Sequence, residues 1–337
     1  MQYSRANAKE WAAEHWRGVC NVVMPSYSSD LRELNEQAIR HDVRRNIELG
    51  YWGALLVSEC GTSLEEYRRF MEIAVDEAKG RQHFLIHGVF DTPEQTVEMA
   101  RAGEAIGVSG VLLGQPNWFY PRSKDQLYGY LERVAGQTNL AVCLFATVQM
   151  NLTRLHPSGY PPRVLARAAD IENVVAVKYE VGRPGIAGDL ELWKMLKGKH
   201  VLFSDPLEAH SPLTVEMFGQ QWLGTSNYEY WGDAVPRYFK LLLEKRFPDA
   251  MEIYWRINPA RQARAAIQTT FAGGNFIHRY LWKYQGWLHG YNGGPMRQPV
   301  MKLNDSQMRS VREPLLKCGF DIPDEDAVAF YQGRNPC

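Results

Sequence analysis

The chain has 337 residues, of which 45% are hydrophobic and 23% are charged, a composition typical of a folded globular protein. Lysine plus arginine and aspartate plus glutamate both number 38, so no basic surplus favours nucleic acid as a partner. No stretch of about twenty apolar residues is available to cross a bilayer, and we therefore expect no membrane partner.

The five cysteines are scattered along the chain and include no Cys-x-x-Cys pair. This spacing argues against a disulfide framework and against a zinc site. The nine histidines form no His-Glu-x-x-His motif, so we expect neither a metal nor another cofactor. The polar first ten residues lack the apolar core of a signal peptide, and the expected compartment is the cytoplasm.

Short apolar runs alternate with amphipathic stretches over most of the chain. The apolar runs predict strands over Val19–Met24, Gly53–Ser58, His83–Val89, Gly110–Leu113, Ala141–Ala146, Val174–Lys178, His200–Ser204 and Trp222–Ser226. The stretches between them predict helices over Leu34–Leu49, Leu64–Ala78, Pro93–Ile106, Lys124–Ala135, Pro161–Ala168, Asp189–Leu196, Thr214–Phe218 and Val235–Glu244.

Eight strand–helix units predict an α/β protein with a (β/α)8 TIM barrel over residues 1–245. A doubly wound sheet is the alternative, but no Gly-x-Gly-x-x-Gly follows the first strand. Residues 246–337 predict a helical extension packed on the barrel. Its helices are expected over Ala250–Phe271, Phe276–Trp287 and Asp305–Cys318, followed by a polar tail.

The sixth predicted strand carries the strongest candidate residue. Four apolar residues, Val174 to Val177, run straight into Lys178, and a polar turn follows at 182–185. Such a run is typical of a strand buried on both faces, and its far end lies where a parallel barrel opens. An amine in apolar surroundings loses its proton and can form a Schiff base with a carbonyl compound. The alternative is an ordinary solvated or ion-paired lysine.

Two loops after other strands provide further candidates. Cys60-Gly-Thr-Ser63 follows the second strand, and the hydroxyls of Thr62 and Ser63 in a glycine-containing turn could hold a carboxylate. The same residues could simply cap the next helix. Trp118 and Tyr120 follow the fourth strand. Because aromatic residues make up 12% of the chain, we expect either heavy core packing or a pocket for a planar, apolar substrate.

Several segments together resemble the dihydrodipicolinate synthase/N-acetylneuraminate lyase superfamily of class I aldolases. These segments are Asn173-Val-Val-Ala-Val-Lys178, Gly110-Val-Leu-Leu-Gly-Gln-Pro116 with Trp118, Gly294-Pro-Met-Arg-Gln-Pro-Val-Met301, Asn304–Arg312 and Leu315–Gly319. Within this superfamily, the sequences Lys178-Tyr179 and Pro116-x-Trp118 favour one branch, the hydratase-aldolases that cleave benzylidenepyruvates.

The resemblance implies a lyase in which Lys178 forms a Schiff base with the ketone of a 2-oxo acid such as pyruvate. It also implies a Gly-Thr-Thr/Ser-type turn that holds the carboxylate, a tyrosine ending the fifth strand that shuttles protons, and a homo-oligomer, either tetramer or dimer. Ser226 and Asn227, after the eighth strand, are candidates for lining the substrate site.

Two departures from the family pattern bear on the chemistry. Phe145 stands where the family has its tyrosine, and phenylalanine carries no proton. In the turn after the second strand, either Gly61-Thr62-Ser63 or Ser58-Glu59-Cys60 replaces part of the family motif. Tyr120, Tyr228 and Glu59 are candidates for a substitute proton carrier. The alternatives to an ordinary aldolase are therefore a changed reaction (dehydration, decarboxylation or condensation) and a non-catalytic binding barrel.

Overall fold

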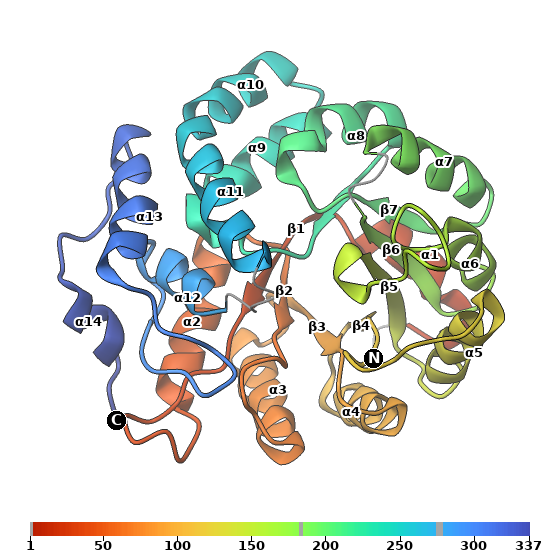
Figure 1. The fold of residues 1–337 in the computed structure, drawn as a ribbon, viewed down its shortest axis with the longest axis horizontal. Coiled ribbons are helices and arrows are strands. Elements are labelled where there is room, and N and C mark those ends of the chain that lie inside the picture. The colour runs from red at the N-terminus through yellow and green to blue at the C-terminus, as the bar shows by residue number, and fades with distance from the viewer. Residues whose placement is uncertain (1–2, 182–184, 274–278) are drawn as a thin grey trace. The chain divides into compact units, whose positions relative to one another are not determined.

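The computed structural model describes residues 3–181, 185–273 and 279–337. Eight strands form one sheet in the order β7-β6-β5-β4-β3-β2-β1-β8 (Figure 1). The bounds are β1 Gly18–Val23, β2 Gly53–Leu56, β3 His83–Gly88, β4 Gly110–Leu113, β5 Ala141–Thr147, β6 Val174–Glu180, β7 Leu202–Ser204 and β8 Trp222–Gly224. Because β8 pairs in parallel with β1, the sheet curves into a barrel. The predicted (β/α)8 TIM barrel is confirmed.

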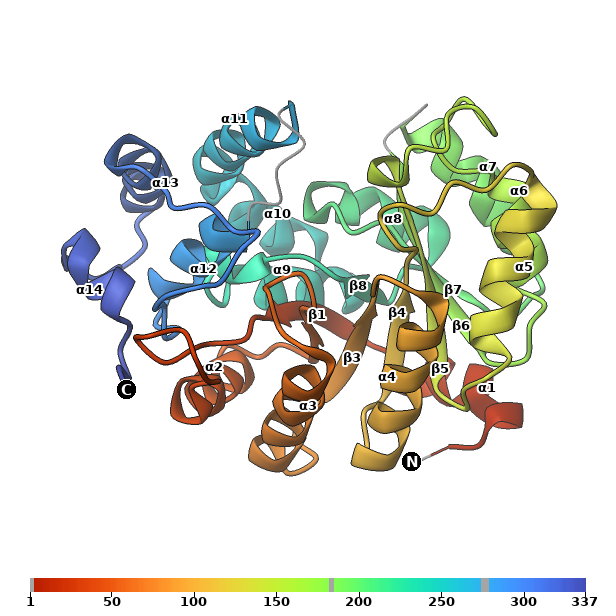
Figure 2. The same ribbon diagram turned by 60° about the horizontal axis from the view of Figure 1, so that its bottom comes forward.

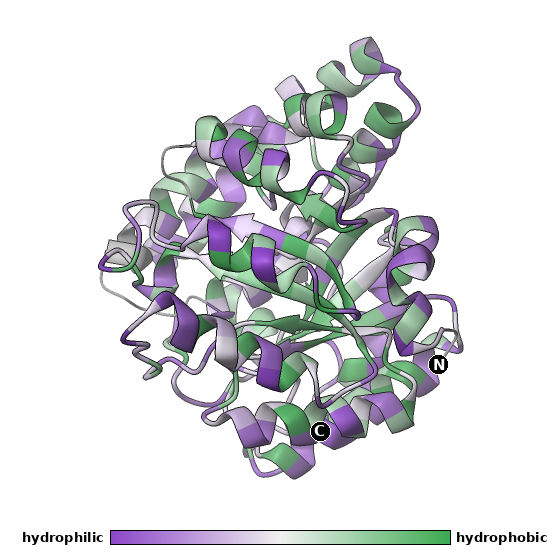
Figure 3. Cartoon of the chain, turned by 90° about the vertical axis from the view of Figure 1, so that its right-hand side faces the viewer, coloured by the Kyte–Doolittle hydropathy of each residue, from purple (hydrophilic) through white to green (hydrophobic). Residues whose placement is uncertain are grey.

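A helix follows each strand, as the alternating pattern predicted. These helices are α2 Glu36–Glu48, α3 Leu64–Ala78, α4 Pro93–Ile106, α5 Lys124–Ala135, α6 Pro162–Ala168, α7 Ile186–Leu196, α8 Ser211–Phe218 and α9 Ala234–Leu243. Figures 1 and 2 show α4 to α7 lying outside β4 to β7. In Figure 3 the strands are mainly green, whereas the helices carry both colours, as expected for helices with one buried face.

Contacts divide the chain into two compact units that interleave in sequence. The first unit holds Met1–Cys20, Trp52–Leu55 and His83–Thr225, and therefore most of the sheet. The second unit holds Asn21–Tyr51, Leu56–Gln82 and Ser226–Cys337. The predicted domain boundary at residue 245 stays a prediction.

In the first unit, a buried asparagine fixes the beginning of β6. The side-chain amide of Asn173 donates to the carbonyl oxygens of Ala135, Thr138 and Leu140 at 2.9–3.1 Å. The Asn173 carbonyl in turn accepts a hydrogen bond from the backbone amide of Val142 at 2.8 Å. Because buried polar groups need partners, these bonds tie the start of β6 to the chain that leads into β5.

A one-residue register shift between β5 and β6 sets which side chains face each other. Val142 pairs with Val174, but Cys143 pairs with Ala176, so the ladder skips one residue of β6. After this bulge, Phe145 pairs with Lys178. Without the shift, Phe145 would pair with Val177, so this local irregularity creates the neighbourhood of the lysine.

Aromatic rings fill the first unit at the amino ends of the strands. The ring of Trp16 lies 5.0 Å from that of Trp222 and 5.6 Å from that of Trp52, between centroids. The helix α1 (Ala8–His15), which was not predicted, packs here because Ala8, Trp11 and Ala12 form one buried face. These rings close the end of the barrel opposite to the carboxyl ends of the strands.

The C-terminal helices differ from the prediction in two ways. They are α10 Phe247–Arg256, α11 Asn258–Gly273, α12 Arg279–Trp287, α13 Asp305–Lys317 and α14 Ala327–Gln332. The helix predicted over Ala250–Phe271 is broken after Arg256, because Pro259 has no N–H with which to continue the hydrogen-bond ladder. The expected polar tail contains α14, whose Phe330 is buried and whose N-terminus is capped by Asp326.

Two predicted features lie partly outside the described residues. Of the expected turn at 182–185, residues 182–184 are outside the described part. The same is true of residues 276–278, the predicted start of the helix that ends at Trp287.

Candidate active site

Lys178 lies near the carboxyl end of β6, with its side chain only 6% exposed. Its Nζ is 4.1 Å from the centroid of the Phe145 ring, and Ser204 of β7 is its register partner on the other side. The lysine, the phenylalanine and the serine therefore form one row across three neighbouring strands. Phe145, which stands where the family has its tyrosine, is thus a direct neighbour of the Lys178 amine.

A carboxylate that the sequence analysis missed lies beside the lysine. Oε2 of Glu180 is 3.1 Å from Nζ of Lys178, and the Glu180 side chain is 39% exposed. The predicted strand ended at Lys178, whereas the observed strand continues to Glu180. Side chains two residues apart point to the same face of a strand, so extending the strand by two residues would have revealed the pair.

Two buried thiols lie in the electrostatic environment of the lysine. Burial raises the pKa of the Cys143 thiol to about 12, and the positive charge of Lys178 partly opposes this shift. Burial likewise raises the pKa of Cys20 on β1, next to Cys143. Both cysteines are fully buried, so they are neutral, inert fillers of the barrel interior.

Gly114, directly after β4, lies beside the Phe145 ring and is packed too closely against Val89 for a side chain. A Cβ atom at Gly114 would lie 2.4 Å from Cγ1 of Val89 and 3.5 Å from Cδ1 of Phe145. Only a residue without a side chain fits here. The ring is thus packed from the β4 side while its face meets the lysine amine.

The two aromatic candidates after β4 are largely exposed. Trp118 is 67% exposed, and its indole N–H donates to the carbonyl of Asp91 at 2.7 Å. Tyr120 is 66% exposed, and the guanidinium of Arg154 lies 3.5 Å from its ring centroid. Neither residue forms a hydrogen bond, ion pair or ring contact with Lys178 in the described part of the chain. The role of Tyr120 as proton carrier stays a prediction.

In the second unit, the turn before α3 is held tightly. Ser63 caps α3, with its Oγ accepting from the backbone amide of Glu66 at 3.1 Å. The Thr62 hydroxyl is 3.5 Å from the Ser58 carbonyl. Gly61 has φ +76°, and a Cβ atom there would lie 2.5 Å from the carbonyl oxygen of Gln298. The capping alternative is therefore confirmed for Ser63, while carboxylate binding by Thr62 and Ser63 stays a prediction.

Glu59, in the same turn, forms an ion pair with Arg279, which also lies 4.2 Å from the Trp282 ring centroid. Tyr228, another candidate proton carrier, is 1% exposed within a short 3-10 helix, Tyr228–Trp231. Glu59 therefore has a structural partner and Tyr228 is buried, while the role of either residue as proton carrier stays a prediction.

Ser226 and Asn227 share a polar cluster in the second unit. Nη2 of Arg264, on α11, donates to Ser226 Oγ at 3.2 Å and also contacts Asn227 Oδ1. The amide of Asn227 donates to Gln285 on α12, and both residues are fully buried. The predicted lining residues therefore gather with an arginine, a group suited to binding anions.

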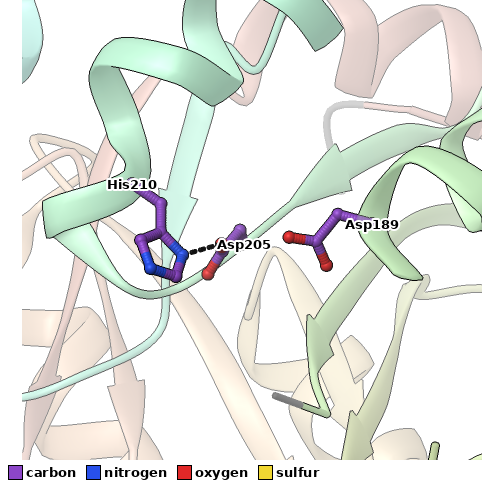
Figure 4. A group of neighbouring side chains, drawn as sticks. All are labelled: Asp189, Asp205 and His210. Atoms are coloured by element: carbon purple, nitrogen blue, oxygen red, sulfur yellow. Dashed lines mark hydrogen bonds and ion pairs between the residues drawn. The ribbon is translucent and has the colours of Figure 1, made fainter. Parts of the chain in front are cut away.

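The first unit contains a group of side chains with the chemistry of metal ligands. Asp189 of α7, Asp205 after β7 and His210 have ligand atoms within 4.8 Å of one another (Figure 4). Asp205 already accepts from Leu207 N at 2.8 Å and from His210 Nδ1 at 2.6 Å. Burial, and then the Asp205 charge, raise the pKa of Asp189 to about 7. The Asp205–His210 hydrogen bond joins two members of this group, and Asp189 lies beside them.

The chain matches known proteins over most of its length. The profile of the dihydrodipicolinate synthetase family matches residues 15–317. A 4-hydroxy-tetrahydrodipicolinate synthase from Methanothrix thermoacetophila is 23% identical over 314 residues, which cover 90% of this chain and 97% of that protein. One from Desulforudis audaxviator is 30% identical over 165 residues, which cover 47% of this chain. In the matches to this and two further synthases, the chain spans about half of the relative's length (53%, 53% and 55%).

Solved structures share the fold. The N-acetylneuraminate lyase from Fusobacterium nucleatum superposes with a TM-score of 0.73 at 18% identity, over 90% of this chain and 99% of that chain. No helix among the described residues is long and apolar enough to span a membrane. From the profile match over residues 15–317, together with the barrel that carries Lys178, we conclude that the chain belongs to the dihydrodipicolinate synthetase family.

Proposed function

We propose that the protein is a Schiff-base-forming lyase of the class I aldolase type, with Lys178 as its nucleophile. The substrate would be a 2-oxo acid such as pyruvate, or an adduct of pyruvate. The observation that carries this proposal is a lysine amine buried at the carboxyl end of a barrel strand. Catalytic groups of TIM barrels lie at that end, and the relatives are named as synthases and a lyase.

The apolar surroundings of Lys178 support a nucleophilic role. A Schiff base turns the substrate carbonyl into an iminium, which withdraws electrons and allows the neighbouring carbon–carbon or carbon–oxygen bond to break or form. The Phe145 ring on one side of the amine excludes water, while its face tolerates the positive charge of the ammonium and of the iminium.

The exposed aromatic side chains of Trp118 and Tyr120 favour a bulky or aromatic partner over a sugar acid. This agrees with the lean toward the hydratase-aldolases of benzylidenepyruvates. In this proposal Tyr120 moves protons to and from the substrate, apart from those exchanged at Nζ of Lys178, and Trp118 contacts the substrate. Thr62 and Ser63 hold the carboxylate, and Ser226 and Asn227 line the site.

The other proposals concern assembly and compartment. Exposed apolar side chains on α7 and α8 (Leu190, Leu213 and Met217) support a homo-oligomer, a tetramer or dimer. None of the five cysteines, all of which lie in the described part of the chain, forms a disulfide, which supports a cytoplasmic location.

One observation favours a second candidate function. Phe145 lies against the lysine amine and cannot carry a proton, so the site could run a dehydration, a decarboxylation or a condensation, or bind a carbonyl compound without turnover.

Reduction with borohydride in the presence of pyruvate tests the proposal. If Lys178 forms a Schiff base, reduction adds the mass of the reduced pyruvate to the protein, and Lys178→Arg abolishes the addition. A panel of 2-oxo acids, including a benzylidenepyruvate, then ranks substrates by turnover. Failure of every compound to add mass would leave the non-catalytic barrel as the better description.

A further inference from the structure

Among the described residues of the first unit, the side chains of Phe145 and Glu180 adjoin the amine of Lys178, and they differ in their capacity for proton transfer. The Phe145 ring, 4.1 Å from Nζ, has no group that gains or loses a proton. The Glu180 carboxylate, 3.1 Å from Nζ, is within hydrogen-bond reach and can both accept and donate a proton. Geometry therefore makes Glu180 the immediate partner for protons that leave the amine.

The position of Glu180 is set by the backbone. The β5–β6 ladder continues past the pair Phe145–Lys178 to the pair Thr147–Glu180. Lys178 and Glu180 lie two residues apart on this strand, so their side chains share a face. The lysine is 6% exposed and the glutamate 39% exposed. The carboxylate thus connects a buried amine with the more open side of the site.

We propose that Glu180 is a catalytic residue that shuttles protons between Nζ of Lys178 and the oxygen of the substrate ketone. This inference rests on the proposed function, since it assigns to Glu180, and not to Tyr120, the proton transfers at Nζ in that same Schiff-base reaction.

The proton balance of Schiff-base formation fits this role. The ammonium of Lys178 gives one proton to the Glu180 carboxylate, and the freed amine attacks the ketone carbon, which forms the C–N bond and an alkoxide. Glu180 passes its proton to that oxygen, giving a carbinolamine. Glu180 then takes a second proton from the nitrogen and delivers it to the hydroxyl, the C–O bond breaks, and water leaves.

The balance closes without any further reactant. Both protons of the released water come from the nitrogen, and the iminium keeps the one remaining N–H. Glu180 begins and ends as a carboxylate. Its carboxylate therefore faces the ammonium before the reaction and the iminium after it. Both are positively charged, so Glu180 is part of an ion pair in both states.

The test measures the rate at which the reduced pyruvate adduct accumulates on the intact protein under cyanoborohydride. We expect Glu180→Gln to slow adduct formation by about 10²- to 10⁴-fold, because an amide of the same shape cannot shuttle protons. Glu180→Asp should retain part of the rate. Formate, a small carboxylic acid, should accelerate Glu180→Ala, which has room for it.

Glu172→Gln is the matched control, since it breaks another ion pair of the first unit, with Arg5 at 2.9 Å. It should react at the wild-type rate, and thermal unfolding should be alike for all variants. A Glu180→Gln rate equal to wild type would overturn the shuttle, and so would a slow Glu180→Ala variant that formate does not accelerate. A wild-type protein that gains no adduct would instead refute the proposed function itself.

Discussion

The amine of Lys178 lies 4.1 Å from the centre of the Phe145 ring, and the two residues are register partners across β5 and β6. A cation over an aromatic face gains about 0.5–2 kcal/mol, depending on how far it is desolvated. The ring can therefore hold the ammonium in place. It cannot take part in proton transfer, and our proposal gives that task to Glu180, whose Oε2 lies 3.1 Å from Nζ.

A hydroxyl on the Phe145 ring should partly replace a lost carboxylate. We expect Phe145→Tyr, introduced into Glu180→Gln, to raise the rate of adduct formation with pyruvate by about tenfold, because a phenol can exchange protons near Nζ. Phe119→Tyr in the same background is the control, since the Phe119 ring packs 4.9 Å from Tyr130 instead. If Glu180→Gln and the two double variants all react at the same rate, the placement of Phe145 beside the reacting amine is wrong.

The turn before α3 should depend on the absence of a side chain at Gly61. Gly61 and Gly80 have nearly the same φ, +76° and +75°, but a Cβ atom would meet Gln298 O at 2.5 Å only at Gly61. Gly80→Ala should cost about 1–2 kcal/mol of unfolding free energy through backbone strain alone. Gly61→Ala should cost about 1–3 kcal/mol more, from the clash. Urea unfolding measures both, and equal losses would show that the turn is looser than described.

Asp189 should make stability depend on pH. Burial, and then the nearby Asp205, raise its pKa from 3.8 to about 7, so its protonated form is favoured in the folded state. The stability that it contributes is full below pH 4 and is lost as the pH rises towards 7. The hydrogen bond with Asp205 also raises the pKa of His210, whose contribution is lost as the pH rises above 6.5.

Asp189→Asn removes the carboxyl group with the raised pKa and leaves Asp205 and His210 in place. We expect the variant to lose less stability than wild type between pH 5 and pH 8, by on the order of 2 kcal/mol. Urea unfolding at several pH values measures the difference. Asp125→Asn, at an exposed ion pair with Arg167, should follow the wild-type profile. An Asp189→Asn profile parallel to wild type would argue against a buried, protonated Asp189.

Most of the fold was predictable from the sequence, because burial on both faces leaves a clear apolar run in each strand of a parallel barrel. All eight strands occur where they were predicted, and Lys178 lies near the carboxyl end of the sixth. The break of the C-terminal helix before Pro259 carried a visible signal, the proline itself. The helix α1 carried no comparable signal, because its few buried positions are set by packing partners such as Tyr3. The Tyr3 ring stacks 4.3 Å from that of Trp11.

The site was less predictable, for reasons of register and distance. The skipped residue in β6 places Phe145 beside Lys178, and no local sequence signal marks it. Glu180 was missed because the strand was ended two residues too early. The network of Asp189, Asp205 and His210 joins three separate elements, and only the fold brings them together (Figure 4).

The most direct test of the account is to find which lysine is modified when the protein is reduced with borohydride in the presence of pyruvate. Lys283 is the main rival, since burial lowers its pKa to about 8, although its amine donates to Pro25 O and Ser26 Oγ, both at 3.1 Å. Peptide mass spectrometry should find the added mass on the peptide that contains Lys178 and none on the one that contains Lys283. An adduct on Lys283, or on no lysine at all, would contradict the account.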